Sequence, residues 1–170
     1  AYALYANTTG YSNTASGYNA LSSNTTGYYN TAIGHASLQL NTTGSVNTAS
    51  GYTALNKNTT GAENTASGYE ALKSNTTGAN NTASGYRALY LNSTGTRNIA
   101  IGYAAYDASD TEDDNLAIGY DALGGAIAGG EKNIAIGNYS LDANTSGDNN
   151  VAVGYQALRA NTTGSGNMAT

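Results

Sequence analysis

Apolar and polar residues follow one another along this chain in a pattern that repeats every 17 residues. One copy runs from Asn13 to Tyr29, and its opening asparagine recurs along the chain, with one extra residue before the copy at Asn133. The opening asparagines are Asn13, Asn30, Asn47, Asn64, Asn81, Asn98, Asn115, Asn133, Asn150 and Asn167. A short fixed period is typical of solenoids, in which each unit packs mainly on its neighbours. The pattern therefore predicts a single repeat array over residues 1–170.

Within the unit, the third position is always alanine, as at Ala15, and the ninth is almost always leucine, as at Leu21. Glycine occupies the fifth and fifteenth positions, as at Gly17 and Gly27. This spacing lacks the i, i+3, i+4 period of a helix, and each glycine in a helix costs about 1 kcal/mol. We therefore predict an all-β parallel solenoid, or β-roll, of about ten coils. Each coil is expected to hold two short strands, at positions 1–4 and 6–10 of the unit, separated by turns.

The faces of the predicted strands differ because side chains alternate across a strand. An alanine in every copy suits a narrow, packed lumen. The threonine and serine hydroxyls of the second and fourth positions would need hydrogen-bond partners if they were buried. We therefore expect the Ala15 and Leu21 columns to face inward. The second and fourth positions then point outward. They are mostly threonine and serine in the first half, as at Thr14 and Ser16. From Asn98 onward they form an apolar stripe: Ile99, Ile101, Leu116, Ile118, Ile134, Ile136, Val151 and Val153.

A lumen of alanine with one leucine per coil buries little apolar surface for a stable fold. The outward stripe of isoleucine and valine is, in turn, an apolar patch that invites a partner. If several copies pack their stripes around a common axis, both problems are solved. The sequence therefore predicts cyclic self-association.

Four segments of the second half carry a recognisable motif: Asn98-Ile-Ala-Ile-Gly-Tyr, Asn115-Leu-Ala-Ile-Gly-Tyr, Asn133-Ile-Ala-Ile-Gly and Asn150-Val-Ala-Val-Gly-Tyr. They resemble the head repeats of YadA-like trimeric autotransporter adhesins, in which an Asn-Ser-Val-Ala-Ile-Gly motif recurs. Similar repeats occur in phage tail fibres and other extracellular fibres. The 17-residue unit is longer than the usual head repeat, and the first half has Thr-Ala-Ser in place of Val-Ala-Ile.

The resemblance implies a left-handed parallel β-roll and a homotrimer displayed outside a Gram-negative cell. It also implies that the trimer attaches to a host surface, a matrix protein or a glycan. The expected function is an extracellular structural or adhesive fibre segment that acts by multivalent display, and the alternative is a phage-type tail fibre shaft or filament subunit. Because the chain starts and ends inside a unit, we expect a segment of a longer fibre, anchored through regions outside it.

Charge narrows the range of partners. The net charge is -5, and the six lysines and arginines are scattered along the chain, which argues against nucleic acid. The chain has no cysteine for a disulfide or thiolate metal site. No long apolar run or signal-peptide pattern is present, so we expect no membrane contact within this segment.

Candidate chemistry is sparse, and we expect no enzyme activity and no cofactor. His35 is the only histidine, and it occupies a slot that other copies fill with tyrosine, as at Tyr18 and Tyr52. A general base would need a pocket and an orienting partner, so a structural ring is the favoured interpretation. The tyrosine column itself fits a recognition surface, but a stabilising aromatic stack is favoured.

Two loops depart from the repeat, at residues 107–114 and 124–132. The first contains five carboxylates, which fits oxygen ligation of Ca²⁺. It lacks the spacing of a known calcium loop, so a solvated acidic loop is favoured. The second is glycine-rich, and the two together predict one local protrusion.

Asn-x-Ser/Thr sequons recur in register and predict a column along one edge of the rod. Attached glycans would coat this edge, but asparagine and threonine capping a glycine turn is the favoured interpretation. The sequon asparagines are Asn7, Asn24, Asn41, Asn58, Asn75, Asn92, Asn144 and Asn161.

The rows of outward threonine and serine in the first half, such as Thr14 and Ser16, also resemble the flat hydroxyl arrays of ice-binding solenoids. Ile33 and His35 break this region, and the array stops by Asn98. Ice binding is therefore the third and least favoured function.

Overall fold

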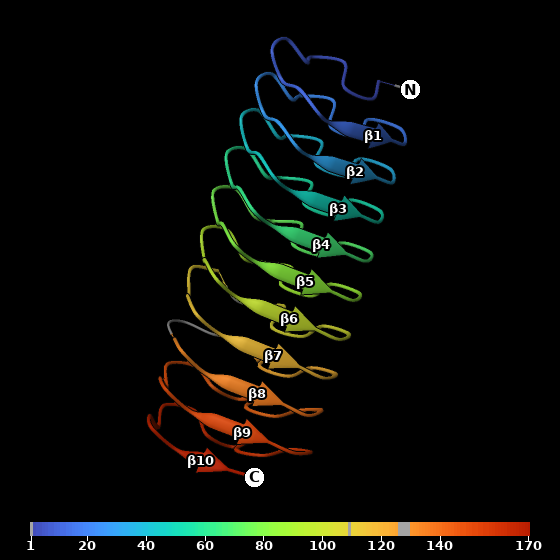
Figure 1. Ribbon diagram of the computed structural model, residues 1–170. Helices are drawn as coiled ribbons and strands as arrows, with labels where there is room; N and C mark the ends of the chain where they lie inside the picture. The colour runs from blue at the N-terminus through green and yellow to red at the C-terminus, as the bar shows by residue number, and fades with distance from the viewer. Residues whose placement is uncertain (1, 109, 126–129) are drawn as a thin grey trace.

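The structure, a computed structural model, describes residues 2–108, 110–125 and 130–170. Ten parallel strands form one sheet, and their order in the sheet is their order in the chain. The strands are β1 (Thr14–Ser16), β2 (Thr31–Ile33), β3 (Thr48–Ser50), β4 (Thr65–Ser67), β5 (Thr82–Ser84), β6 (Ile99–Ile101), β7 (Leu116–Ile118), β8 (Ile134–Ile136), β9 (Val151–Val153) and β10 (Met168–Ala169). About nine turns of a β-solenoid join them. Figure 1 shows the coils stacked into a rod with the chain ends at opposite ends.

The register follows the sequence repeat. Ala15 of β1 pairs with Ala32 of β2, and Ala32 pairs with Ala49 of β3, so each residue stacks on its equivalent in the next coil. The extra residue before Asn133 does not disturb this register, because Ala117 still pairs with Ala135. The described residues contain no helix, and therefore none that is long and apolar enough to cross a membrane. The predicted all-β solenoid is confirmed.

The prediction of a second strand at positions 6–10 of the unit is wrong, because this segment is a succession of turns. The seventh and ninth residues have positive φ in each described coil, as at Asn19 (φ 56°) and Leu21 (φ 52°). A strand requires negative φ, so the chain cannot extend here. Each such residue costs about 1 kcal/mol. The coils compensate with hydrogen bonds between neighbouring turns, such as that from Leu21 N to Ser37 O (2.9 Å).

The lumen contains the expected alanine and leucine columns, since Ala32 and Leu38 are both fully buried. It also contains residues that the sequence pattern did not single out as core. The alanine at the eighth position is buried, as at Ala54, and so are the asparagines at the first and twelfth positions, such as Asn47 and Asn58. The coil therefore fills its interior with polar as well as apolar columns.

Candidate functional surfaces

The asparagine columns are two hydrogen-bonded ladders inside the coil. In the twelfth-position ladder, Asn58 Nδ2 donates to Asn41 Oδ1 of the previous coil (2.8 Å) and to Gly61 O of its own coil (2.9 Å). In the first-position ladder, Asn47 Nδ2 donates to the same Gly61 carbonyl (2.9 Å), and Asn47 N donates to Asn30 Oδ1 (3.0 Å). In each coil that has both asparagines, the two ladders converge on one carbonyl, such as that of Gly61. They satisfy buried amides that would otherwise destabilise the lumen.

These contacts bear on the sequons. Six of the eight sequon asparagines are fully buried: Asn24, Asn41, Asn58, Asn75, Asn92 and Asn144. The other two, Asn7 and Asn161, are half-buried. A glycan is attached through Nδ2, the atom that donates both hydrogen bonds of Asn58. The geometry therefore favours turn chemistry as the interpretation of the sequons.

Replacing Asn58 by alanine is expected to lower the free energy of unfolding by about 3 kcal/mol. The change removes the two bonds that Nδ2 donates, and it leaves Asn75 Nδ2 without the Oδ1 acceptor that it contacts at 2.7 Å. Asn161→Ala is the matched control, because the Asn161 side chain makes one bond, to Gly164 O (2.9 Å), and is half-buried. The control should cost about 1 kcal/mol. Urea unfolding measures both values, and equal losses would contradict the ladder's role.

The outward face of the sheet changes its chemistry along the rod. In β1–β5, threonine stacks on threonine, as Thr48 does on Thr65. The hydroxyls of these two residues form no hydrogen bond with any residue that the structure describes. At the edge of the coil, by contrast, Thr59 Oγ1 donates to Thr76 O of the next coil (3.0 Å). The sheet-face hydroxyls thus remain available to solvent, whereas the edge hydroxyls join the coils.

In β6–β9, the same outward positions form the predicted apolar stripe. Ile99 stacks on Leu116 in one column, and Ile101 stacks on Ile118 in the other. Ile99, Ile101 and Val153 are exposed, and the other five residues of the stripe, Leu116, Ile118, Ile134, Ile136 and Val151, are half-buried. The stripe extends over four adjacent strands. Aliphatic side chains are therefore gathered on one face with no covering element among the described residues.

Beside the sheet, the sixth-position rings form a ladder on the outside of the rod. This aromatic ladder consists of Tyr18, His35, Tyr52, Tyr69, Tyr86, Tyr103 and Tyr120. Neighbouring ring centroids lie 4.8–5.3 Å apart with interplanar angles of 5–18°. His35 stacks between Tyr18 and Tyr52, at 5.3 and 5.1 Å. The structure thus places His35 in the tyrosine slot as the sequence suggested.

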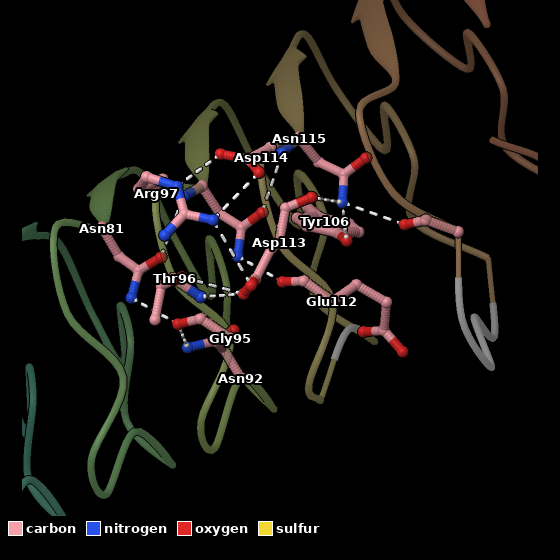
Figure 2. A network of polar contacts seen from close by, with 12 residues as sticks. Asn81, Asn92, Gly95, Thr96, Arg97, Tyr106, Glu112, Asp113, Asp114 and Asn115 are labelled. Atoms are coloured by element: carbon pink, nitrogen blue, oxygen red, sulfur yellow. Dashed lines mark hydrogen bonds and ion pairs between the residues drawn. The ribbon is translucent and has the colours of Figure 1, made fainter. Parts of the chain in front are cut away.

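The acidic loop at residues 107–114 is built into the coil (Figure 2), although Ser109 lies outside the described residues. Glu112 occupies the fifteenth position, where other copies have glycine, and its carbonyl oxygen accepts from Asn98 Nδ2 (2.6 Å). Its Oε2 accepts from the backbone nitrogens of Asp110 (3.0 Å) and Thr111 (3.1 Å). Glu112 is buried. The expectation of a fully solvated loop is therefore wrong at this residue.

The neighbouring carboxylates of the loop are also paired. Asp113 Oδ1 accepts from Thr96 N (2.6 Å) and Thr96 Oγ1 (2.9 Å), and Arg97 contacts Asp114 (2.6 Å from Nε to Oδ1). Arg97 holds the pKa of the Asp114 carboxyl below its usual value through a side-chain hydrogen bond. These carboxylates tie one coil to the previous one, so they do not converge on a cation site.

In the same coil, Tyr106 takes the place of the lumenal leucine. It is fully buried, and its hydroxyl accepts from Asn115 Nδ2 (2.6 Å; Figure 2). Burial raises the pKa of Tyr106 far above its usual value. The residue is therefore a neutral structural group. Of the second altered loop, at residues 124–132, positions 126–129 lie outside the described residues.

Asp107→Asn is expected to stabilise the protein at neutral pH. Burial, and next the nearby Asp121 charge, raises the pKa of Asp107 to about 6 in the folded state, against an ordinary value of 3.8. A carboxyl with a raised folded pKa binds its proton more tightly in the folded chain, so its contribution to stability falls as pH rises from about 4 to about 6. The variant should gain roughly 2 kcal/mol at pH 7, a value reduced because solvent screens this half-buried carboxyl, and almost nothing at pH 4. Urea unfolding at both pH values measures the gain, and an equal gain at both would contradict the assignment.

No pocket and no cluster of three or more potential metal-ligating side chains occurs in the described part of the chain. The candidate sites are therefore surfaces: the hydroxyl rows of β1–β5, the apolar stripe of β6–β9 and the aromatic ladder. No family model, curated protein or solved structure matches the chain.

Proposed function

We propose that this chain is a rod segment of an extracellular homotrimeric fibre, and that the fibre attaches to surfaces by displaying three equal copies of each face. The proposal follows from the shape of the solenoid and from the resemblance of its second-half motif to adhesin head repeats. A phage-type tail fibre shaft or filament subunit is the alternative, because it would also require a rod-shaped segment. The flanking sequence separates the two: a C-terminal membrane barrel indicates an adhesin, and a chaperone domain indicates a tail fibre.

The single observation that carries the proposal is the apolar stripe of β6–β9. Monomers rarely leave a continuous apolar patch of more than a few hundred Å² uncovered. The stripe runs along the rod over adjacent in-register strands. Three parallel copies can therefore bring the same strands together around one axis, in a closed ring that leaves no stripe exposed.

The construction of the rod supports a mechanical role. Each coil is bonded to the next through backbone hydrogen bonds, such as Thr65 N to Asn81 O (2.8 Å), and through the asparagine ladders. A stiff rod holds the surfaces of three chains at fixed separations. A weak contact made by one face is then multiplied by the others, because the later contacts are intramolecular.

The oligomeric state tests this proposal directly. Light scattering coupled to size exclusion is expected to give a particle of three times the 17.2 kDa chain mass. The trimer should keep its mass on dilution to concentrations at which a weak, non-specific contact between chains would dissociate. A folded, stable monomer at 17.2 kDa would overturn the trimer.

A second candidate function, ice binding, is favoured by the free hydroxyls of β1–β5. Stacked strands repeat at about 4.8 Å, and alternate residues along a strand repeat at about 6.7 Å. Rows such as Thr48 and Thr65 beside Ser50 and Ser67 therefore present a regular two-dimensional grid of hydroxyls. Ordered water is the ligand that such a grid would bind. Ice crystals that grow with unchanged shape and rate in the presence of the protein would remove this candidate.

A further inference from the structure

Five tyrosines stand in one uninterrupted stack within the aromatic ladder. We refer to Tyr52, Tyr69, Tyr86, Tyr103 and Tyr120 as the five-tyrosine stack. Their neighbouring ring centroids lie 4.8–5.2 Å apart, and their planes diverge by only 5–8°. His35 separates the stack from Tyr18 at one end. At the other end, the Tyr139 ring is tilted by 59° from Tyr120.

The stack is accessible to solvent without being the most exposed tyrosine surface of the molecule. Its side chains are 37–49% exposed, whereas Tyr5 is 77% exposed and Tyr155 is 70% exposed. Identical rings stacked in register place each phenol oxygen, and the ring carbons ortho to it, beside their counterparts in the next coil. The most exposed tyrosines are therefore not the stacked ones. A reaction that depends on stacking can be distinguished by its sites from one that depends on exposure.

We propose that the five-tyrosine stack is a site of oxidative cross-linking, at which a one-electron oxidant joins the rings of neighbouring coils as dityrosine. A haem peroxidase with hydrogen peroxide is an oxidant of this class. Each of two stacked phenols gives up one electron and its hydroxyl proton, and so becomes a phenoxyl radical. The two radicals combine through a carbon–carbon bond between their ortho carbons. The proton on each of these carbons then moves to the phenol oxygen, which restores both aromatic rings.

The reaction is balanced by the peroxide. Two hydrogen atoms leave each pair of tyrosines, and one hydrogen peroxide takes them up as two molecules of water. The stack favours this outcome in two ways. A radical formed on one ring lies within about 5 Å of the next ring, so it can exchange an electron along the stack. The second ring is also already oriented, so the coupling of two radicals needs no diffusional encounter.

Cross-links of this kind would reinforce the rod. The chain has no cysteine, so disulfides cannot fasten its coils, and each coil depends on its neighbours for stability. A covalent bond between the rings of successive coils prevents their separation and reduces the freedom of the unfolded chain. The aromatic ladder thus offers an alternative covalent fastening on the outside of the solenoid. This inference depends on the ladder alone and not on the trimer.

Tryptic mapping after oxidation tests the proposal, because the few lysines and arginines divide the stack favourably. Peptide 58–73 contains Tyr69 as its only tyrosine, peptide 74–87 contains only Tyr86, and peptide 88–97 contains only Tyr90. The 170-residue chain, in dilute solution, is treated with a haem peroxidase and limiting hydrogen peroxide, and the band at the mass of one chain is recovered from a denaturing gel. We expect peptides 58–73 and 74–87 to be joined with the loss of two hydrogen atoms, and peptide 88–97 to be absent from the products.

Two variants sharpen the test. Tyr69→Phe keeps the ring in place but cannot form a phenoxyl radical, so it should abolish every product that contains peptide 58–73. It should leave the pair of Tyr86 and Tyr103, whose centroids lie 4.8 Å apart, able to couple. Tyr90→Phe is the control outside the stack and should leave the product pattern unchanged.

Two results would overturn the proposal. One is the failure of peptides 58–73 and 74–87 to join within one chain. The other is cross-linking that follows exposure, with Tyr5 and Tyr155 as the main partners. Circular dichroism of each variant before oxidation establishes that the solenoid is folded, so that a negative result reflects chemistry and not unfolding.

Discussion

Replacing both Ile101 and Ile118 by aspartate is expected to convert the proposed homotrimer into folded monomers. The two residues stack on each other in one column of the apolar stripe. A carboxylate buried at an interface without a partner costs several kcal/mol. The pair should therefore weaken association by more than about a thousandfold, which corresponds to roughly 4 kcal/mol. Light scattering should show the particle mass fall to the 17.2 kDa of one chain.

The matched control for this experiment lies in the other half of the same column. Ser67 and Ser84 also stack on each other, and both are exposed on the outward face of the sheet. Replacing both by aspartate introduces two carboxylates in the same pairing between neighbouring coils, so any repulsion between the coils of one chain is similar in the two variants. If the control dissociates to the same extent, the apolar stripe is not the main interface. If the Ile101 and Ile118 variant keeps its assembly, the stripe is not the interface at all.

Much of the fold follows from the repeat alone. A fixed period places equivalent residues one above another whatever the path of the coil, so the parallel register of Ala15 on Ala32 could be predicted. The inward direction of that column followed from a simple argument, since only a small residue fits a narrow lumen in every coil. The outward stripe followed in turn, because alternation along a strand places its residues opposite the alanine.

The path of the chain through positions 6–10 could not be predicted in the same way. Tyr18 to Ser22 is a short segment with apolar residues between two glycine turns, which suggested a strand, yet Asn19 and Leu21 have positive φ. Leucine rarely adopts this conformation, and no residue preference indicates it. The bonds between coils, such as Leu21 N to Ser37 O, select it. They depend on the stacked solenoid and not on the local sequence, so tertiary structure overrides propensity here.

The polar interior was the second feature that the residue types concealed. Asparagine is a common turn residue, which made a solvent-exposed edge the natural interpretation of the twelfth position. Asn58 is instead buried, because the ladder satisfies its amide above, below and across the coil. The signal in the sequence that could have indicated this burial was that a twelfth-position asparagine is always followed, three residues later, by a glycine. It reflects one contact, from Asn58 Nδ2 to Gly61 O, that is repeated in each regular coil.

Gly68→Ala is expected to be the most destabilising single substitution considered for the fold, with a loss of roughly 4 kcal/mol. Gly68 has φ +136°, a conformation that side chains rarely adopt. A Cβ added there would also lie 2.3 Å from the Gly85 carbonyl oxygen and 2.7 Å from the Gly85 carbonyl carbon. Both atoms are backbone of the next coil, so no side chain can rotate away. The two coils would have to separate, which breaks hydrogen bonds along the sheet.

Gly154→Ala separates the two components of this loss. In the chain of residues 1–170, Gly154 has a similar φ of +129°, but no equivalent glycine stacks on it, so a Cβ added there meets nothing within 4 Å. Its substitution should therefore cost only the backbone strain, about 1–2 kcal/mol. The difference between the two variants in urea unfolding then measures what the close approach of successive coils contributes. If the two losses are equal, the φ value alone explains the fifth-position glycine. A larger loss for Gly68 shows instead that the close stacking of successive coils requires glycine there.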